Sequence, residues 1–131
     1  KLKNEHFKLE KIEKITHCIE THRFRDNKTP QTLEAKVLFD ADKLDSIGAV
    51  GIGRAFLFAG ENRAHLHYKN IDPAKVERYS EQDTAYNEFL VKLQHVKNKI
   101  LTAEGSRIAE ERHKFMVNFF DRLNREVDGL I

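Results

Sequence analysis

Three aspartates, Asp40, Asp42 and Asp45, fall within six positions of a segment whose other residues follow a helical period. Aspartate is a poor residue for a helix interior, because its carboxylate competes for nearby backbone groups. Asp40 points away from the apolar stripe of this segment, so we expect it to be solvated. Asp42 and Asp45 border apolar surface, where a carboxylate needs an ion pair, hydrogen bonds or a bound cation. In the simplest interpretation, they are surface carboxylates paired with Lys43 or another basic side chain.

Two further side chains stand out because of their surroundings. His22 continues the apolar stripe of the first predicted helix, near the end where a histidine can hydrogen-bond a helix carbonyl. Arg54 is the only charged residue between positions 47 and 59. It could pair with Asp45 or Glu34, or its planar guanidinium could bind a phosphate group. The residues alone leave both interpretations open.

The elements that position these residues are predicted to be helices, because the helical period dominates and β-branched alternation is nearly absent. The pattern predicts a helix over residues 4–21 and a loop over residues 23–31. A second helix should begin near Thr32, a suitable N-cap, and run on or restart through residues 49–59. One face of this second helix would carry Leu33, Val37, Ala41, Leu44 and Gly48. The predicted fold class is therefore all-α.

The second half of the chain is predicted to hold a polar excursion and a helical pair. Residues 61–80 are mixed and polar. His65 and His67 have the alternate spacing of a metal-binding strand or loop, but their place in a mobile segment argues against a metal site. A third helix should follow the capping signal at residues 80–83, with Tyr86, Phe89, Leu90, Leu93, Val96 and Ile100 inside. A last helix should follow residues 102–105, with Ile108, Phe115, Met116, Phe119, Phe120, Leu123 and Val127 inside. Short connections favour an antiparallel pair.

The order of several motifs resembles a known superfamily. Residues 41–49 read Ala-Asp-Lys-Leu-Asp-Ser-Ile-Gly-Ala and resemble the closing motif of the HD phosphohydrolase superfamily. Residues 19–24, 48–56 and 102–116 are similar to one bacterial branch of small hydrolases in that superfamily. The resemblance covers nearly the whole chain. It implies a helical HD-domain-like bundle that is incomplete at its N-terminus.

The resemblance also implies how the chain is divided and what its residues do. Residues 1–60 would form the C-terminal part of the HD core, and residues 61–131 a loop and helical pair packed on the same domain. Asp42 would be the last metal-ligand aspartate, and Asp45 would orient the metal-activated water or an imidazole ligand. His22 would contact the substrate phosphate or a second metal, and Arg54 would bind substrate.

The implied cofactor is a divalent metal. Carboxylate oxygen together with imidazole nitrogen suits Mn²⁺, Mg²⁺ or Fe²⁺, with Zn²⁺ or Ni²⁺ as further options. The implied reaction is hydrolysis of a small phosphorylated substrate, such as a nucleotide or another phosphate ester, by a metal-activated water. Pocket shape rather than these motifs would decide which substrate is used.

The superfamily's His-Asp pair does not occur in the sequence. The single methionine is Met116, and helical pattern begins at once after Lys1, so we expect the chain to start inside a longer protein that carries those ligands. One carboxylate does not hold a catalytic metal, so this fragment alone should not bind the metal and should be inactive. The alternative is a non-catalytic helical module that dimerises through residues 115–120.

The composition excludes several other classes of function. A net charge of +2, from 23 basic and 21 acidic residues, lacks the basic excess of a nucleic-acid binder. No apolar run is long enough to span a membrane. One cysteine, Cys18, cannot form an internal disulfide and suits a reducing cytosol, so we expect a cytoplasmic protein. The expected partners are a small phosphorylated molecule and a second copy of the chain.

Overall fold

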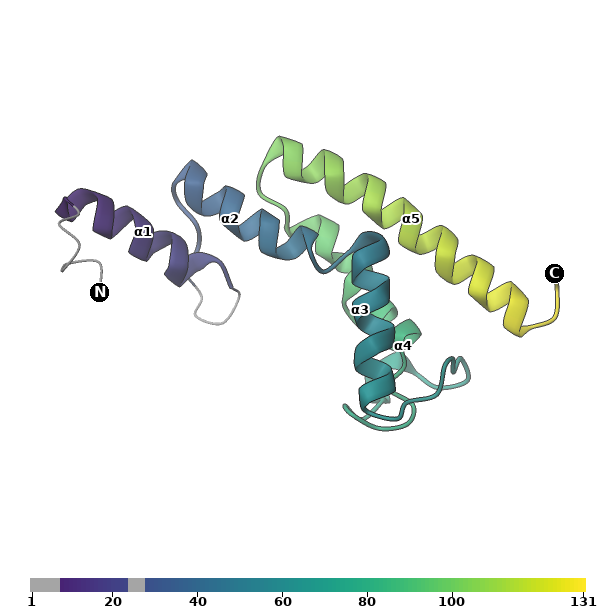
Figure 1. Ribbon diagram of the computed structural model, residues 1–131. Coiled ribbons are helices and arrows are strands. Elements are labelled where there is room, and N and C mark those ends of the chain that lie inside the picture. Colours follow the sequence, from purple (N-terminus) through teal and green to yellow (C-terminus); the bar gives the residue numbers. More distant parts are fainter. Residues whose placement is uncertain (1–7, 24–27) are drawn as a thin grey trace.

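The computed structural model describes residues 8–23 and 28–131, and all the regular elements in these ranges are helical (Figure 1). The predicted all-α class is confirmed. The α-helices are α1 (Leu9–Thr21), α2 (Leu33–Leu44), α3 (Gly48–Glu61), α4 (Ala85–Val91) and α5 (Ala103–Val127), and two 3₁₀ helices are η3 (Pro73–Lys75) and η4 (Leu93–Lys99). The first residues of the first predicted helix lie outside the described ranges. Within those ranges, no helix combines the length and apolarity needed to cross a membrane.

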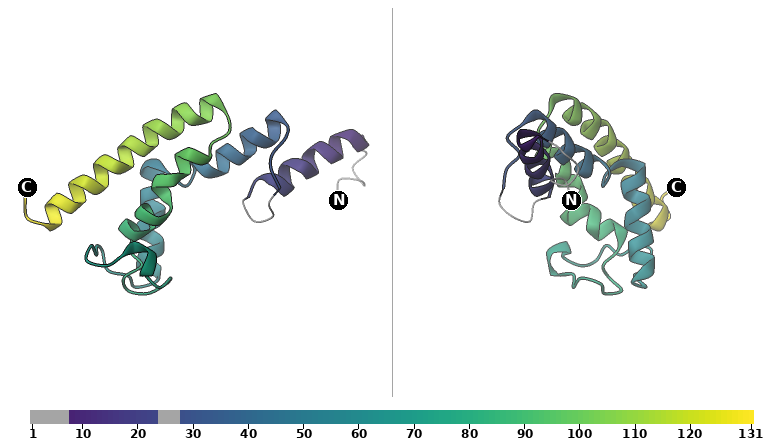
Figure 2. Two further views of the ribbon diagram at one scale, coloured as in Figure 1. Left: turned by 180° about the vertical axis from the view of Figure 1, so that it is seen from behind. Right: turned by 60° about the vertical axis from the view of Figure 1, so that its left-hand side comes forward.

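The core lies where α3, α4 and η4 pack against the long helix α5 (Figure 2). Aromatic rings form its centre: Phe120 of α5 stacks on Phe89 of α4 with ring centroids 4.5 Å apart, and Phe56 of α3 packs on the same ring at 6.4 Å. Burial of such rings supplies most of the stabilising free energy of a small helical domain. The other buried apolar residues of this cluster are Ile47, Ile52, Ala55, Ala85, Leu93, Val96, Ala109 and Met116.

The chain stops and restarts between α2 and α3, which settles the two predicted alternatives. Ser46 Oγ donates a hydrogen bond to the Lys43 carbonyl at 2.7 Å, and Gly48 follows with a left-handed φ of +77°. A Cβ added at Gly48 would lie 2.9 Å from Arg112 Cγ, so glycine is required both for its backbone angle and for this close approach. Arg112 Nη1 donates to the Leu44 carbonyl at 2.5 Å. The side chain of Arg112 therefore joins α5 to the end of α2.

Only the last part of the predicted apolar face packs: Leu44 lies against the core and Gly48 is buried, whereas the rest of that face is exposed. Leu33 and Val37 are 69% and 53% exposed, whereas Phe39 is buried. The buried residues of α2 are Ala35, Phe39, Asp40 and Lys43. Both sides of this helix carry apolar residues, so the helical period alone cannot choose the side that meets α5.

The third predicted helix is two elements in the structure. Thr84 caps α4 by accepting a hydrogen bond from Asn87 N at 3.1 Å, and Lys92 ends it with a φ of −138° before η4 begins. Phe89 is buried as predicted, together with Leu93 and Val96. In α5, Met116 and Phe120 are buried as predicted, but Phe115 and Val127 are about half exposed.

The excursion between α3 and α4 is anchored to the rest of the molecule. His65 N donates to the Glu81 carbonyl at 2.8 Å, which joins the start of the excursion to its end. His67 Nε2 lies 2.7 Å from Asn124 Oδ1 of α5, and Lys69 forms an ion pair with Asp128. The two histidines therefore contact different partners.

Candidate functional site

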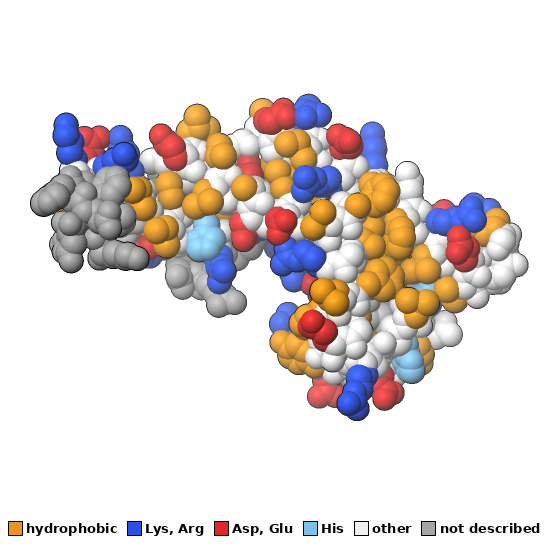
Figure 3. Space-filling view, viewed as in Figure 1, with side chains coloured by type: hydrophobic (Ala, Val, Ile, Leu, Met, Phe, Trp, Pro, Cys, Tyr) orange, Lys and Arg blue, Asp and Glu red, His pale blue; other side chains and the backbone are white. Residues whose placement is uncertain are grey.

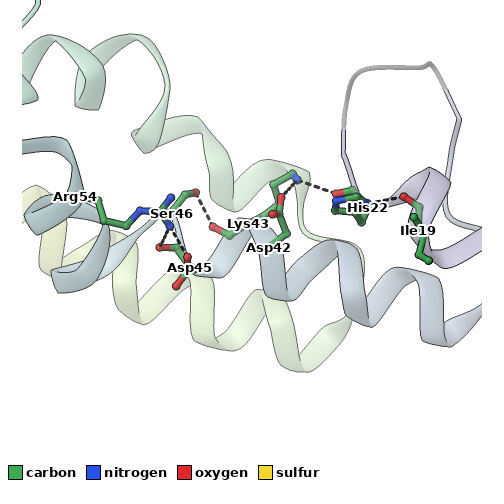
Figure 4. A network of polar contacts seen from close by, with 7 residues as sticks. All are labelled: Ile19, His22, Asp42, Lys43, Asp45, Ser46 and Arg54. Carbon is green, nitrogen blue, oxygen red and sulfur yellow. Dashed lines mark hydrogen bonds and ion pairs between the residues drawn. The ribbon is translucent and has the colours of Figure 1, made fainter. Parts of the chain in front are cut away.

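The residues predicted to do chemistry lie along one edge of the molecule, from the end of α1 to the first turns of α3 (Figure 4). Asp42 Oδ2 lies 2.6 Å from Lys43 Nζ, and Asp45 forms an ion pair with Arg54 across the α2–α3 break. These are the two pairings that the simplest interpretation of the sequence predicted. The Asp42 side chain stays 44% exposed, so its carboxylate is accessible to a ligand.

Lys43 connects His22 with Asp42. Lys43 Nζ donates to the His22 carbonyl oxygen at 3.1 Å and lies 4.5 Å from the centroid of the Phe39 ring. The side chain is only 10% exposed, because it crosses the interface between α1 and α2. The ammonium group therefore holds the end of α1 beside Asp42.

His22 itself makes a structural contact. Its Nδ1 lies 2.5 Å from the Ile19 carbonyl oxygen, which is the helix-carbonyl contact expected of a histidine at the edge of a core. A carbonyl only accepts, so this geometry places the proton on Nδ1 when the ring is neutral. The catalytic role of His22 stays a prediction.

Asp40 is buried, which contradicts the expectation that it is solvated. It is 2% exposed, and its Oδ1 accepts a hydrogen bond from Leu101 N at 2.8 Å. Its Oδ2 accepts from Thr102 N at 2.8 Å and from Thr102 Oγ1 at 2.6 Å. The prediction for Asp40 was wrong because the wrong face of α2 was expected to pack. No local sequence pattern links Asp40 with Thr102, which lies 62 positions away. Asp40 holds α2 against the start of α5, where the helix dipole also favours a negative charge.

The described residues do not make up a complete metal site. Residues 8–23 and 28–131 contain no group of three or more His, Cys, Asp or Glu side chains that could hold a metal ion. Asp42 offers one hard oxygen ligand, and the nearest charged partner described beside it is Lys43. His65 faces Glu81, with 3.9 Å between Nε2 and Oε2, at a different end of the molecule.

One cavity lies beside Arg54, and a second adjoins it farther along the groove between α3 and α4. The first has a volume of about 310 Å³, and the second, bounded by the excursion, about 800 Å³. Both lie in the size range of small-molecule sites. Phe58, Glu88 and Lys92 line both cavities, so the two adjoin. Figure 3 shows acidic and basic side chains gathered near the α2–α3 junction, at the end of α3 where the first cavity begins.

Comparison with known proteins gives a consistent set of relatives. The chain is 37% identical over 125 residues to the uncharacterised Bacillus subtilis protein YpgQ, covering 92% of this chain and 55% of YpgQ. The crystal structure of YpgQ in complex with ADP matches with a TM-score of 0.72 at 32% identity, covering 95% of this chain and 57% of that one. The structure of an HD-superfamily hydrolase from Bacillus thuringiensis matches with a TM-score of 0.77 at 28% identity, covering 97% and 58%. No protein-family model matches the chain. The chain spans little more than half the length of these relatives.

Proposed function

The chain is a partial HD-domain protein, homologous to YpgQ and to an HD-superfamily hydrolase, and from this premise we propose that the whole protein is a metal-dependent phosphohydrolase acting on a nucleotide. The main support for a nucleotide substrate is the crystal structure of YpgQ in complex with ADP. The cavity beside Arg54 supports it, because a guanidinium is suited to a phosphate group. Other phosphate esters are the alternative substrates.

Four residues have proposed roles in this function. Asp42 supplies one carboxylate ligand to a divalent metal, of which Mn²⁺, Mg²⁺ and Fe²⁺ suit the donor chemistry best and Zn²⁺ and Ni²⁺ are further options. Asp45 orients a neighbouring ligand or water, and His22 contacts the phosphate. Arg54 binds the substrate. The remaining metal ligands have to come from outside the described residues, so no reaction step is assigned to these groups.

Phosphate release by the whole protein tests this function. We expect release of phosphate from ADP or a related nucleotide in the presence of Mn²⁺, and loss of that activity with a chelator. Asp42→Asn should lower the rate at least about a hundredfold, because replacing even an outer-shell partner of a metal ligand costs up to that factor. Asp121→Asn, which changes an exposed carboxylate of α5, should leave the rate unchanged. Full activity of Asp42→Asn would contradict the assignment.

The 131-residue chain by itself should be inactive, because a single carboxylate does not hold a catalytic metal. Stoichiometric binding of Mn²⁺ to this chain in a calorimetric titration would contradict that expectation. A non-catalytic helical module is the second candidate, favoured by the exposed apolar residues Leu33 and Val37 on α2. Dimerisation through residues 115–120 would use Phe115 and Val117, which are 49% and 42% exposed, because Met116 and Phe120 are buried in the core.

A further inference from the structure

We propose that the groove between α3 and α4 binds the nucleoside part of the substrate, with its base against the rings of Phe58 and Tyr79. This inference rests on the proposed function and names the part of the molecule that recognises the base. The occupant is a purine or pyrimidine ring carrying a ribose phosphate. The larger of the two cavities provides the space, about 800 Å³.

Two exposed aromatic rings form one wall of this cavity. The ring centroids of Phe58 and Tyr79 are 5.8 Å apart, and the two residues are 48% and 63% exposed. Among the described aromatic residues, Phe56, Tyr86, Phe89 and Phe119 pack around Phe120 in the core, whereas this pair faces the cavity and solvent. Aromatic side chains in such a position bind bases by stacking, since every base presents a π face.

Tyr79 has an unfavourable backbone conformation, and its largely exposed side chain gains little burial energy to compensate for it. Its φ is +64°, in the left-handed region that bulky residues rarely adopt. Asp83 Oδ2 accepts a hydrogen bond from Tyr79 N at 2.9 Å, and Asp83 Oδ1 accepts from Asn87 Nδ2 at 3.3 Å. These bonds fix the turn and present the ring toward Phe58. A strained residue whose ring stays largely in solvent is more readily explained by a ligand than by packing.

The basic residues of the groove suit the phosphate end of the same ligand. Arg54 lies one turn before Phe58 on α3, a rise of roughly 6 Å along the helix axis. Lys92 lines both cavities between these two ends, and its Nζ is 2.5 Å from Glu88 Oε1. A ligand with its base at Tyr79 and its phosphates at Arg54 would pass Lys92. Its phosphates would compete with Asp45 for Arg54 and with Glu88 for Lys92, because each of these basic side chains forms an ion pair.

A purely structural role for the aromatic pair is the competing explanation. In that explanation, the contact between Phe58 and Tyr79 only holds the segment between α3 and α4 against α3. The excursion is already fastened to α5 through His67 with Asn124 and through Lys69 with Asp128. Loss of the Tyr79 ring should therefore change ligand affinity much more than thermal stability.

Binding measurements on the 131-residue chain separate these explanations. Calorimetric titrations with ADP and with pyrophosphate are made in EDTA, so that neither metal binding nor hydrolysis contributes. We expect ADP to bind about tenfold more tightly than pyrophosphate, and Tyr79→Leu to remove that difference, since stacking on one ring contributes about this factor. Tyr68→Leu is the matched control, because Tyr68 is another exposed tyrosine of the excursion and does not line either cavity. It should leave both affinities unchanged.

The outcomes distinguish this inference from the proposed function. Equal affinity of the unaltered chain for ADP and pyrophosphate, no binding of ADP, or an unchanged ADP affinity in Tyr79→Leu would overturn the base site. A fall in melting temperature of Tyr79→Leu without loss of ADP affinity would assign the ring to packing. If ADP binding depends on Tyr79 but the whole protein releases no phosphate, the base site stands and the hydrolase proposal fails.

Discussion

At the scale of single residues, the carboxylate of Asp40 links two helices that are far apart in the sequence. It is almost fully buried and accepts three hydrogen bonds from Leu101 and Thr102. Thr102 Oγ1 in turn accepts a hydrogen bond from Gly105 N at 3.1 Å as the N-cap of α5. A Cβ at Gly105 would lie 2.6 Å from Asp40 Oδ2, so the approach of α2 to α5 also requires this glycine.

Asp40→Ala should lower the free energy of unfolding by about 3 kcal/mol, because two buried backbone N–H groups and one hydroxyl lose a charged acceptor. Urea denaturation followed by circular dichroism measures the change. Asp42→Ala is the matched control on the same helix: its ion pair with Lys43 is partly exposed, and its loss should cost less than about 1 kcal/mol. A similar loss in both variants would show that Asp40 has no special structural role.

At the scale of elements, α2 presents its packed side and its open side at positions only two residues apart. Phe39 is 4% exposed, whereas Val37 is 53% exposed. The aromatic ring of Phe39 lies under the ammonium group of Lys43. The packed side of α2 therefore supports the orientation of Lys43.

Truncation of these two side chains should have very different effects. Phe39→Ala should cost about 3–5 kcal/mol, because it removes a buried ring and leaves a cavity. Val37→Ala should change the stability by no more than about 0.5 kcal/mol in this chain, since the residue is exposed. Guanidinium chloride midpoints measure both. Comparable losses would mean that the face predicted from the helical period is packed in solution.

The all-α class and the Thr32 N-cap were predicted, whereas the packing of the helices was not. Thr32 accepts a hydrogen bond from Ala35 N at 3.2 Å, because a cap depends on residues three positions apart. The predicted capping signal at residues 80–83 was wrong, since Thr84 caps α4, and α5 begins at Ala103 rather than after residue 105. The burial of Asp40 depends on a partner 62 positions away, which no local pattern reveals. The Asp45–Arg54 ion pair joins residues nine positions apart on either side of the α2–α3 break, so it was neither as predictable as a cap nor as hidden as the Asp40 contact. The sequence left open whether Arg54 forms an ion pair or binds a phosphate group. The contact between Phe58 and Tyr79 was not predicted, because it joins a helix to a loop residue that carries no periodic signal.

At the scale of the whole molecule, α1 stands apart from the core. It packs mainly against α2 and extends away from the other helices (Figures 1 and 2). Of its residues only Thr21 is buried, and Leu9 and Ile19 are 64% and 57% exposed. Segments with few buried apolar contacts open more readily than the core that carries them. The end of α1 is nonetheless the segment that brings His22 to Lys43.

Native-state hydrogen exchange should therefore show two levels of protection. The opening free energy of amides in α1 should be lower than that of amides around Met116 and Phe120 by at least about 1.4 kcal/mol, a tenfold difference in exchange rate. Mass spectrometry of peptides from each helix resolves the two. Uniform protection of α1 and α5 would mean that the chain opens as one cooperative unit.

The contact between Asp40 and Thr102 also constrains the order in which the chain can fold. It closes a loop of about 60 residues, and the entropy lost in closing a loop of this length is large compared with that of any turn within a helix. Helix α4 and the 3₁₀ turns lie inside that loop and can form before it closes. The first turn of α5 receives the Asp40 carboxylate only when α2 arrives, so we expect the docking of α2 on α5 to follow local helix formation.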